Sequence, residues 1–298
     1  MLFFRVKINE DITVTNHIDS FLLDLAVQEK KSLRTQQINK QVLSEFQKYL
    51  GTQKADVTSA RAFIRSRAPK IKASTQALLV SVLRQYSRWL QKNHEDENKT
   101  SWLLKAPKLS QRIIKVFSEE DVELLLKVID ERGLEQKILF HLLYGSALRI
   151  SEALGLKWKD VDLKSKRICV LGKGSKWRWV PITNETAELL GEQQKRAASG
   201  GGLEKDSFWH GGIDYQCARK WVDSWGYESG LSKELGSLNP HRLRHALASH
   251  MLRRGARLPH VQKMLGHKKL ATTERYTHLD INDLIRIYDE SLPKKLVE

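Results

Sequence analysis

Hydrophobic residues recur at helical spacing through the first hundred positions of the chain. Three sets of apolar side chains lie three or four positions apart: Ile18, Phe21, Leu22 and Leu25; Ile38, Val42, Phe46 and Leu50; Leu79, Leu83, Tyr86 and Leu90. Such spacing places each set on one face of a helix. Gly51 follows the second set directly, as the C-terminal cap of a helix often does. The first part of the chain is therefore predicted to be helical.

The last of these segments also carries a basic stripe. Arg84, Arg88 and Lys92 are four positions apart, on the side opposite the apolar residues. A helix of this kind suits a phosphate backbone, which basic side chains contact without reading the sequence. A solvent-facing polar side explains the stripe equally well. The three residues are therefore candidate DNA contacts.

The helical period is lost between two regular regions. Residues 95–112 are rich in polar and charged side chains, which predicts an interdomain linker. We expect an N-terminal helical domain over residues 12–94 and a second domain over residues 113–298. Ser118 and Asp121 form a capping box, so the second domain is predicted to begin with a helix near residue 118.

The second domain contains one short region of strand pattern. Residues 167–171 and 177–182 are rich in β-formers and flank the segment Gly-Lys-Gly-Ser-Lys, which predicts a hairpin. Helical pattern precedes it at 135–144 and follows it at 243–254 and 259–265. The predicted fold is mainly α, with a small antiparallel β-sheet.

The charge of the chain favours one class of partner. It has 298 residues, with 51 Lys and Arg against 35 Asp and Glu, and a formal net charge of +16. A solvated basic surface accounts for such an excess. The alternative is a polyanionic partner, most often nucleic acid, that is bound through its phosphates.

Composition excludes several other classes. No apolar run approaches the roughly 18 residues that a membrane-spanning helix needs, and the first residues do not have the pattern of a signal peptide. Cys169 and Cys217 are the only cysteines, too few for a disulfide scaffold or a cysteine-ligated zinc site. We therefore expect a cytoplasmic protein.

Four separate segments carry residues suited to chemistry. In the first, Arg149 stands at a helix start beside small residues, and Glu152 is three positions later on the same face. An ordinary helix ion pair is the simpler interpretation. The alternative is a carboxylate that orients a guanidinium toward an oxyanion.

The second segment is the tip of the predicted hairpin. Lys173 lies between two glycines, and Lys176 follows it. Glycines allow a tight turn and close approach to a ligand, with a long cationic arm exposed. A solvated turn is the common alternative. The segment is not a phosphate-binding P-loop, because no Lys-Ser/Thr pair opens a helix after it.

The third segment places histidines and arginines on one helix. His241 and Arg244 are three positions apart and share a face, whereas His241 and His245 have the spacing of a metal pair. No HExxH glutamate lies between the histidines, and the arginines would repel a cation. A guanidinium group binds two oxygens of one phosphate through two parallel hydrogen bonds. This segment therefore favours a phosphate ligand over a metal ion.

The fourth segment follows the last glycine-terminated helix. His267 comes directly after Gly266, and Tyr276 is nine positions further on among threonines, Arg275 and His278. A lone tyrosine usually serves packing, but these polar neighbours favour an exposed phenol. Together the four segments supply two arginines, two histidines, a lysine and a tyrosine. That set fits phosphoryl transfer through a covalent tyrosine, with no metal and no cofactor expected.

The order and spacing of these motifs resemble those of the tyrosine recombinases, the lambda-integrase superfamily. The matching stretches are residues 147–154, 172–182, 240–246 and 265–278. The resemblance is greatest to the bacterial XerC/XerD group, and the tail at 279–293 looks more like that of XerC. Ala147 replaces a glycine that is usual in the family, a change we expect to be harmless.

The resemblance implies a mechanism. Tyr276 would attack the scissile phosphate, forming a 3′-phosphotyrosyl link and releasing a 5′-hydroxyl. Arg149 and Arg244 would hold the non-bridging oxygens of that phosphate, and His267 would add a hydrogen bond there.

The remaining motif residues would move protons or hold geometry. His241 would accept the proton of the phenol, and Lys173 would protonate the departing 5′-oxygen from the minor groove. Glu152 would hold the geometry of the arginines. Lys176 is a further candidate DNA contact.

The resemblance also implies partners. The two domains would form a C-shaped clamp around double-stranded DNA at a specific recombination site. Four protomers would act on two such sites, with a second, XerD-like recombinase and control by a septal DNA translocase. The C-terminal helix would dock either on a neighbour or on its own chain, a choice that the sequence leaves open. We expect a nucleoid-associated enzyme that resolves chromosome dimers.

Three other functions compete with this one. A recombinase of a phage or mobile element would use the same residues, although no arm-binding domain precedes residue 15. A type IB topoisomerase would use the same tyrosine chemistry to relax supercoils without exchanging strands. A non-catalytic DNA-binding protein would keep the fold, but the intact set of six residues disfavours it.

Overall fold

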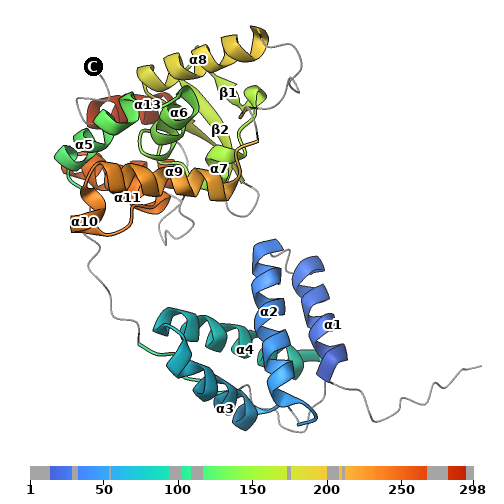
Figure 1. Cartoon of the computed structure of the whole chain (residues 1–298). Helices are drawn as coiled ribbons and strands as arrows, with labels where there is room; N and C mark the ends of the chain where they lie inside the picture. Colours follow the sequence, from blue (N-terminus) through green and yellow to red (C-terminus); the bar gives the residue numbers. More distant parts are fainter. Residues whose placement is uncertain are drawn as a thin grey trace, which may run out of the picture. The chain divides into compact units, whose positions relative to one another are not determined.

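The chain forms two separately packed units (Figure 1). The computed structural model describes residues 14–28, 33–53, 55–93, 102–108, 117–172, 176–199, 208–209, 212–266 and 281–292. Contacts divide the chain into a first unit over Met1–Ile113 and a second over Ile114–Glu298. Each unit has its own cluster of buried hydrophobic side chains.

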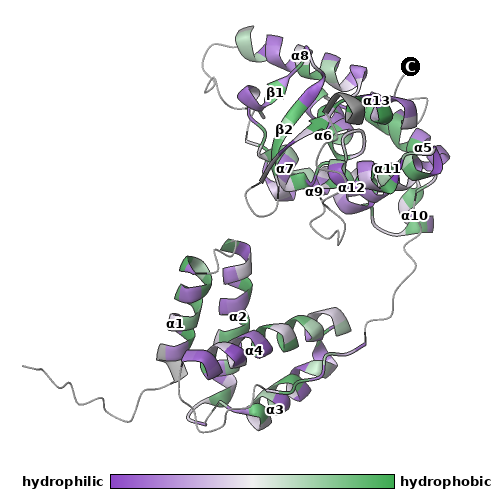
Figure 2. Ribbon diagram, turned by 180° about the vertical axis from the view of Figure 1, so that it is seen from behind, coloured by the Kyte–Doolittle hydropathy of each residue, from purple (hydrophilic) through white to green (hydrophobic). Residues whose placement is uncertain are grey.

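The first unit consists of helices. They are α1 (Val14–Val27), α2 (Leu33–Leu50), α3 (Val57–Arg67), the 3-10 turn η1 (Ala68–Lys70) and α4 (Ala73–Asn93). The apolar face predicted for α4 is confirmed, because Leu79, Leu83 and Tyr86 are buried. Figure 2 shows hydrophilic and hydrophobic residues together on these helices, as is typical of amphipathic helices that pack through one face.

Part of the segment expected to be a linker packs onto the first unit. The ring of Trp102 lies edge-on to Phe46 and to Tyr86, and its backbone N–H donates to Ser87 Oγ at 2.7 Å. Leu104 is buried in the same cluster. Trp102 and Leu104 therefore pack in this hydrophobic cluster, whereas Leu103 between them is exposed. Residues 95–101 and 109–112 lie outside the described residues.

The second unit is mostly helical around one small sheet. Its helices are α5 (Glu119–Asp130), α6 (Leu134–Leu143), α7 (Ile150–Leu154), α8 (Asn184–Ser199), α9 (Tyr215–Glu228), α10 (Leu231–Leu235), α11 (Pro240–Arg253), α12 (Leu258–Leu265) and α13 (Ile281–Ser291), with the 3-10 turn η2 (Trp158–Asp160). The predicted capping box at Ser118 and Asp121 is confirmed as the start of α5. Asn239 caps α11 with Pro240 at its first position, so this helix begins before residue 243.

The sheet contains the expected hairpin. Strands β1 (Val161–Asp162), β2 (Arg167–Gly172) and β3 (Lys176–Pro181) are antiparallel in that order. The register pairs Cys169 with Trp179 and Gly172 with Lys176. Ile168 and Val180 are buried on one face. Because side chains alternate along a strand, Arg178 points to the same face as Val180.

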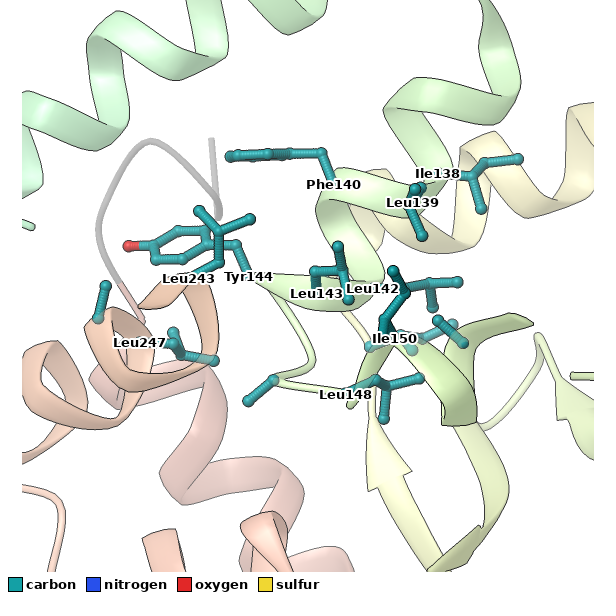
Figure 3. Packing of buried hydrophobic residues seen from close by; sticks show 14 of the residues in the cluster. Ile138, Leu139, Phe140, Leu142, Leu143, Tyr144, Leu148, Ile150, Leu243 and Leu247 are labelled. Carbon is teal, nitrogen blue, oxygen red and sulfur yellow. The ribbon is translucent and has the colours of Figure 1, made fainter. Parts of the chain in front are cut away.

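Helices α6 and α11 meet in the core of the second unit. Figure 3 shows Tyr144, at the end of α6, beside Leu243 and Leu247 of α11. The Tyr144 hydroxyl lies 2.9 Å from His250 Nδ1. The His250 ring also contacts the carbonyl of Phe117 at 2.6 Å, so its Nε2 carries the proton and donates while Nδ1 accepts from the tyrosine.

The C-terminal helix packs on its own chain. Tyr288 of α13 is completely buried, and its hydroxyl donates to the carbonyl of Gly145. Leu292 is buried in the same cluster. Of the two arrangements left open by the sequence, this structure has the intramolecular one. No helix in the described part of the chain is long and apolar enough to cross a membrane.

Two helix-interior glycines differ in the space around them, which gives a stability test. A Cβ added at Gly226 of α9 would lie 2.6 Å from Leu238 Cβ and 2.8 Å from Ser232 Oγ, whereas one at Gly191 of α8 would meet nothing within 4 Å. We expect Gly226→Ala to lower the free energy of unfolding by about 1–3 kcal/mol through overpacking. Gly191→Ala should raise it by about 0.5–1 kcal/mol.

Chemical denaturation of the two variants beside the unchanged protein measures both effects. Both substitutions exchange glycine for alanine in a helix. Opposite changes in the free energy of unfolding would therefore come from the difference in packing around the two sites. A destabilised Gly191→Ala, or an unaffected Gly226→Ala, would contradict the packing described for these helices.

Candidate functional site

A tight turn between α6 and α7 presents Arg149. The backbone N–H groups of Ser146 and Leu148 donate to the carbonyls of His141 and Leu142, at 3.0 and 2.9 Å. Ala147 in this turn has φ +49°, in the left-handed region. That conformation costs a residue with a Cβ about 1–2 kcal/mol. A glycine, which the resemblance makes usual at this position, would avoid the cost. The exchange to alanine therefore carries local strain, and the expectation that it is harmless is wrong.

Glu152 lies at the centre of the site. Its carboxylate accepts from the backbone N–H of Arg149 at 2.9 Å and from Arg149 Nη1 at 2.6 Å. The side chain of Glu152 is only 4% exposed, against 25% for that of Arg149. The pair expected from the sequence is therefore present, and it joins the start of α7 to a buried carboxylate.

A second arginine, not singled out by the sequence analysis, binds the same carboxylate. Arg178 of β3 donates from Nη1 and Nη2 to the two oxygens of Glu152, at 3.0 and 2.9 Å. Its Nε donates to the carbonyl of Met264 in α12 at 3.1 Å. The signal that identifies it is the strand alternation, which puts a charged residue on the buried face of the hairpin.

Arg244 of α11 lies close to the same carboxylate. Its Nη1 donates to the carbonyl of Ala147 at 2.5 Å, and its Nη2 donates to the carbonyl of Leu265. Nη1 is also 3.7 Å from Glu152 Oε2. Burial lowers the pKa of Arg244 to about 10, with a further contribution from the positive charge of Arg149. The guanidinium remains charged at neutral pH.

The charge state of Glu152 follows from its partners. Burial would raise the pKa of this carboxyl, but the hydrogen bonds from Arg178 and Arg149 outweigh burial and hold the pKa below its ordinary value. Glu152 is therefore ionised at neutral pH. Three guanidinium groups surround one carboxylate, which leaves the site with an excess of positive charge.

His241 lies at the edge of this charged cluster. It is in the first turn of α11, and its side chain is exposed. Although the ring is exposed, neighbouring groups displace part of its water, and this desolvation lowers the pKa of His241; the positive charges of Arg244, His245 and Arg149 lower it further. The imidazole is therefore neutral at neutral pH and able to accept a proton.

The structure describes some of the other candidates and leaves three outside. Lys173, His267 and Tyr276 lie outside the described residues. Lys176 is the first residue of β3. Within the described part of the chain, no three His, Cys, Asp or Glu residues come together as a group able to hold a metal ion.

The three residues of the basic stripe on α4 differ in their exposure. Arg84 is partly buried and donates from Nη2 to the carbonyl of Leu104. Arg88 and Lys92 are exposed. One member of the stripe thus helps to hold residues 102–104 on the first unit, and the other two face solvent.

Comparison with known proteins identifies the family. The model of the phage integrase family matches residues 115–283. The chain is 33% identical over 249 residues to the tyrosine recombinase XerC of Escherichia coli, covering 81% of this chain and 82% of that protein.

Solved structures share the fold at lower identity. The XerH site-specific recombinase bound to its difH substrate has a TM-score of 0.67 at 21% identity, covering 89% of this chain and 82% of that one. A lambda integrase dimer bound to a core site has a TM-score of 0.69 at 15% identity, covering 91% of this chain and 100% of that one. The chain therefore belongs to the phage integrase family, the tyrosine recombinases, and is similar to XerC.

Proposed function

We propose that this protein is a site-specific tyrosine recombinase of the XerC type, which cuts and rejoins DNA in the resolution of chromosome dimers. The observation that carries the proposal is the meeting of Arg149 and Arg244 at the Glu152 carboxylate, from helices far apart in the sequence. Similarity to XerC over four-fifths of the chain supports the cellular role.

The arginine cluster is suited to a phosphodiester. Arg149 is partly exposed while its Nη1 is held by Glu152, so its remaining N–H groups are available for a phosphate oxygen. Arg244 adds a buried positive charge that needs no reorganisation when charge develops on the phosphorus oxygens. The site therefore stabilises the transition state of phosphoryl transfer through fixed cations.

The proposed reaction exchanges one phosphodiester for another. The Tyr276 oxygen forms a bond to phosphorus as the bond from phosphorus to the 5′-oxygen breaks. His241 takes the phenol proton, Lys173 supplies a proton to the 5′-oxygen, and His267 donates a hydrogen bond to the phosphate. Because the bond energy is kept in the phosphotyrosine, a 5′-hydroxyl from a partner duplex reverses the step and completes strand exchange.

The proposed assembly rests on the resemblance to the XerC/XerD group. That resemblance implies four protomers on two DNA sites, with an XerD-like recombinase in the same complex and control by a septal DNA translocase. The two units act as a clamp on the duplex. Exposed Arg88 and Lys92 on α4 are candidate phosphate contacts of the first unit. We expect the enzyme on the nucleoid, in the cytoplasm.

Covalent capture of DNA tests the proposed function directly. Protein recovered from cells under denaturing conditions should carry DNA on Tyr276, and sequencing of that DNA should return one site. Tyr276→Phe should carry none, because the attacking oxygen is missing. Captured DNA without a common sequence would instead favour a topoisomerase, and absence of any adduct would contradict the proposal.

The phosphate-binding role of the arginines is tested by separating cleavage from binding. Arg149→Ala and Arg244→Ala should each lower the rate of single-turnover cleavage by about 100-fold or more, because each removes a fixed charge from the transition state. DNA affinity, measured by gel shift, should change little, since many other phosphate contacts remain.

Arg253→Ala provides the matched control. Arg253 is an exposed residue in the last turn of α11, the helix that carries Arg244. Its loss should leave cleavage within a few-fold of the unchanged protein. Parallel loss of DNA binding in the Arg149 and Arg244 variants would argue against the roles proposed for them.

The proposed base role of His241 predicts a pH profile. A base must be unprotonated, so cleavage should be present above the pKa of His241 and be lost as the pH falls through it. Because that pKa is lowered, the midpoint of the acid limb should lie below the ordinary imidazole value of roughly 6.5. His241→Gln should cleave slowly and lack this limb in single-turnover measurements between pH 5 and 8.

His245→Gln is the control, and it should shift the acid limb of the pH profile in one direction. The positive charge of His245 helps to lower the pKa of His241. Its removal should move the acid limb toward higher pH while activity at neutral pH is kept. An unchanged acid limb in the His241 variant would assign the limb to another group.

A further inference from the structure

The Glu152 carboxylate lies between two arginines that hold it and a third that it nearly reaches. Arg149 and Arg178 both donate to it at 3.0 Å or less. Arg244 is 3.7 Å away, outside hydrogen-bonding distance. All three cations attract the same buried anion, so the contacts that Glu152 makes decide how much positive charge is left for a ligand.

Arg178 is held too completely to act on a ligand itself. Its fork binds both carboxylate oxygens, its Nε binds the carbonyl of Met264, and its side chain is 14% exposed. A Cβ at Gly266 would lie 3.1 Å from this Nε, so the guanidinium lies directly against the end of α12. Arg178 thus joins β3, α7 and α12 through one planar group.

We propose that Arg178 is a positioning residue for strand cleavage, which occupies both oxygens of Glu152 and so keeps the ion pair between this carboxylate and Arg244 from closing into a hydrogen bond. The inference rests on the proposed function and deepens it. A bidentate guanidinium fixes a carboxylate in orientation as well as in charge. Glu152 then orients Arg149 through its own short contact, while Arg244 stays in the looser 3.7 Å ion pair and is not drawn away from the phosphate.

The consequence of losing Arg178 follows from the geometry. A buried carboxylate that loses a partner seeks another, because an uncompensated buried charge is costly. Arg149 already donates to this carboxylate, so the next cation is Arg244, whose Nη1 needs less than 1 Å of closure to reach hydrogen-bonding distance. Capture of Arg244 would neutralise one of the two groups assigned to the phosphate and would shift Arg149.

The simpler alternative is that Arg178 only cross-links the hairpin to the helices. Both roles predict a less active Arg178→Gln, so activity by itself does not separate them. They differ in what happens when Glu152 is made neutral. A glutamine at position 152 cannot capture Arg244 as an anion does, whereas a missing cross-link is made worse by a second lost contact.

The experiment is a double-mutant cycle on single-turnover cleavage. The substrate is a nicked duplex carrying the sequence captured on Tyr276. Arg178→Gln should lower the rate by about 100-fold, as expected for a displaced active-site group. The double variant Arg178→Gln/Glu152→Gln should recover at least tenfold of that loss. A double variant that cleaves more slowly than Arg178→Gln, or an Arg178→Gln variant with an unchanged cleavage rate, would overturn the proposal.

A matched control and a conservative variant complete the cycle. Arg167→Gln changes an arginine of the neighbouring strand whose guanidinium lies over Trp179 and contacts Asp162, so cleavage should stay within a few-fold. Arg178→Lys keeps the positive charge but cannot donate to both oxygens of Glu152 at once, so its cleavage rate should fall by about tenfold. Adding Glu152→Gln should restore part of that rate. If Arg178→Gln does not fold, the Arg178→Lys cycle decides by the same criterion.

A crystal structure of full-length Arg178→Gln, or of Arg178→Lys in its place, tests the inference without DNA. A Glu152 oxygen should lie within hydrogen-bonding distance of Arg244. Glu152 and Arg244 in their present positions would overturn the proposal. This outcome is independent of the proposed function, which fails separately if the unchanged protein captures no DNA.

Discussion

One buried carboxylate organises the candidate site of the second unit. Glu152 is ionised and nearly inaccessible, and a charge in that position is tolerated only when cations and hydrogen bonds compensate for lost water. The compensating groups come from the start of α7, from β3 and from α11. Elements distant in the sequence are therefore brought together by the need to satisfy one anion, and the surplus positive charge faces the place where a phosphate is proposed to bind.

The surrounding core supports this arrangement through backbone carbonyls. Arg244 is fixed by the carbonyls of Ala147 and Leu265, and Arg178 is fixed by that of Met264. These carbonyls belong to the turn before α7 and to the end of α12. The turn itself is tied to α13 through Tyr288. The guanidinium groups are thus oriented by main-chain atoms, whose positions are set by the packing of whole helices.

Sequence patterns predicted the elements better than they predicted the partners within the site. The amphipathic face of α4, the capping box of α5 and the existence of the hairpin followed from local sequence patterns, and the pair of Arg149 and Glu152 followed from helical spacing. Helix α3 was not predicted, although Asp56 and Ser59 form a capping box at its start.

Arg178 was missed for a different reason. Strand alternation places this arginine on the buried face of the hairpin, but its partner, Glu152, is 26 positions earlier in the sequence, and no local period encodes such a contact. The packing of residues 102–104 was hidden in the same way, since their polar surroundings are typical of a linker while Trp102 inserts among distant aromatic rings. The resemblance to the family identified residues by motif, but only the fold reveals which side chains compete for one partner.

The anchoring of Leu104 limits how independently the two halves of the protein can search for a ligand. Leu104 is buried in the first unit and Phe117 in the second, and the thirteen peptide steps between them span at most about 45 Å when fully extended. Once either half has engaged a polymer, the other is confined to a small volume around it. Its own association then becomes intramolecular, at an effective concentration on the order of millimolar. Two individually weak contacts can in this way add up to a long-lived complex.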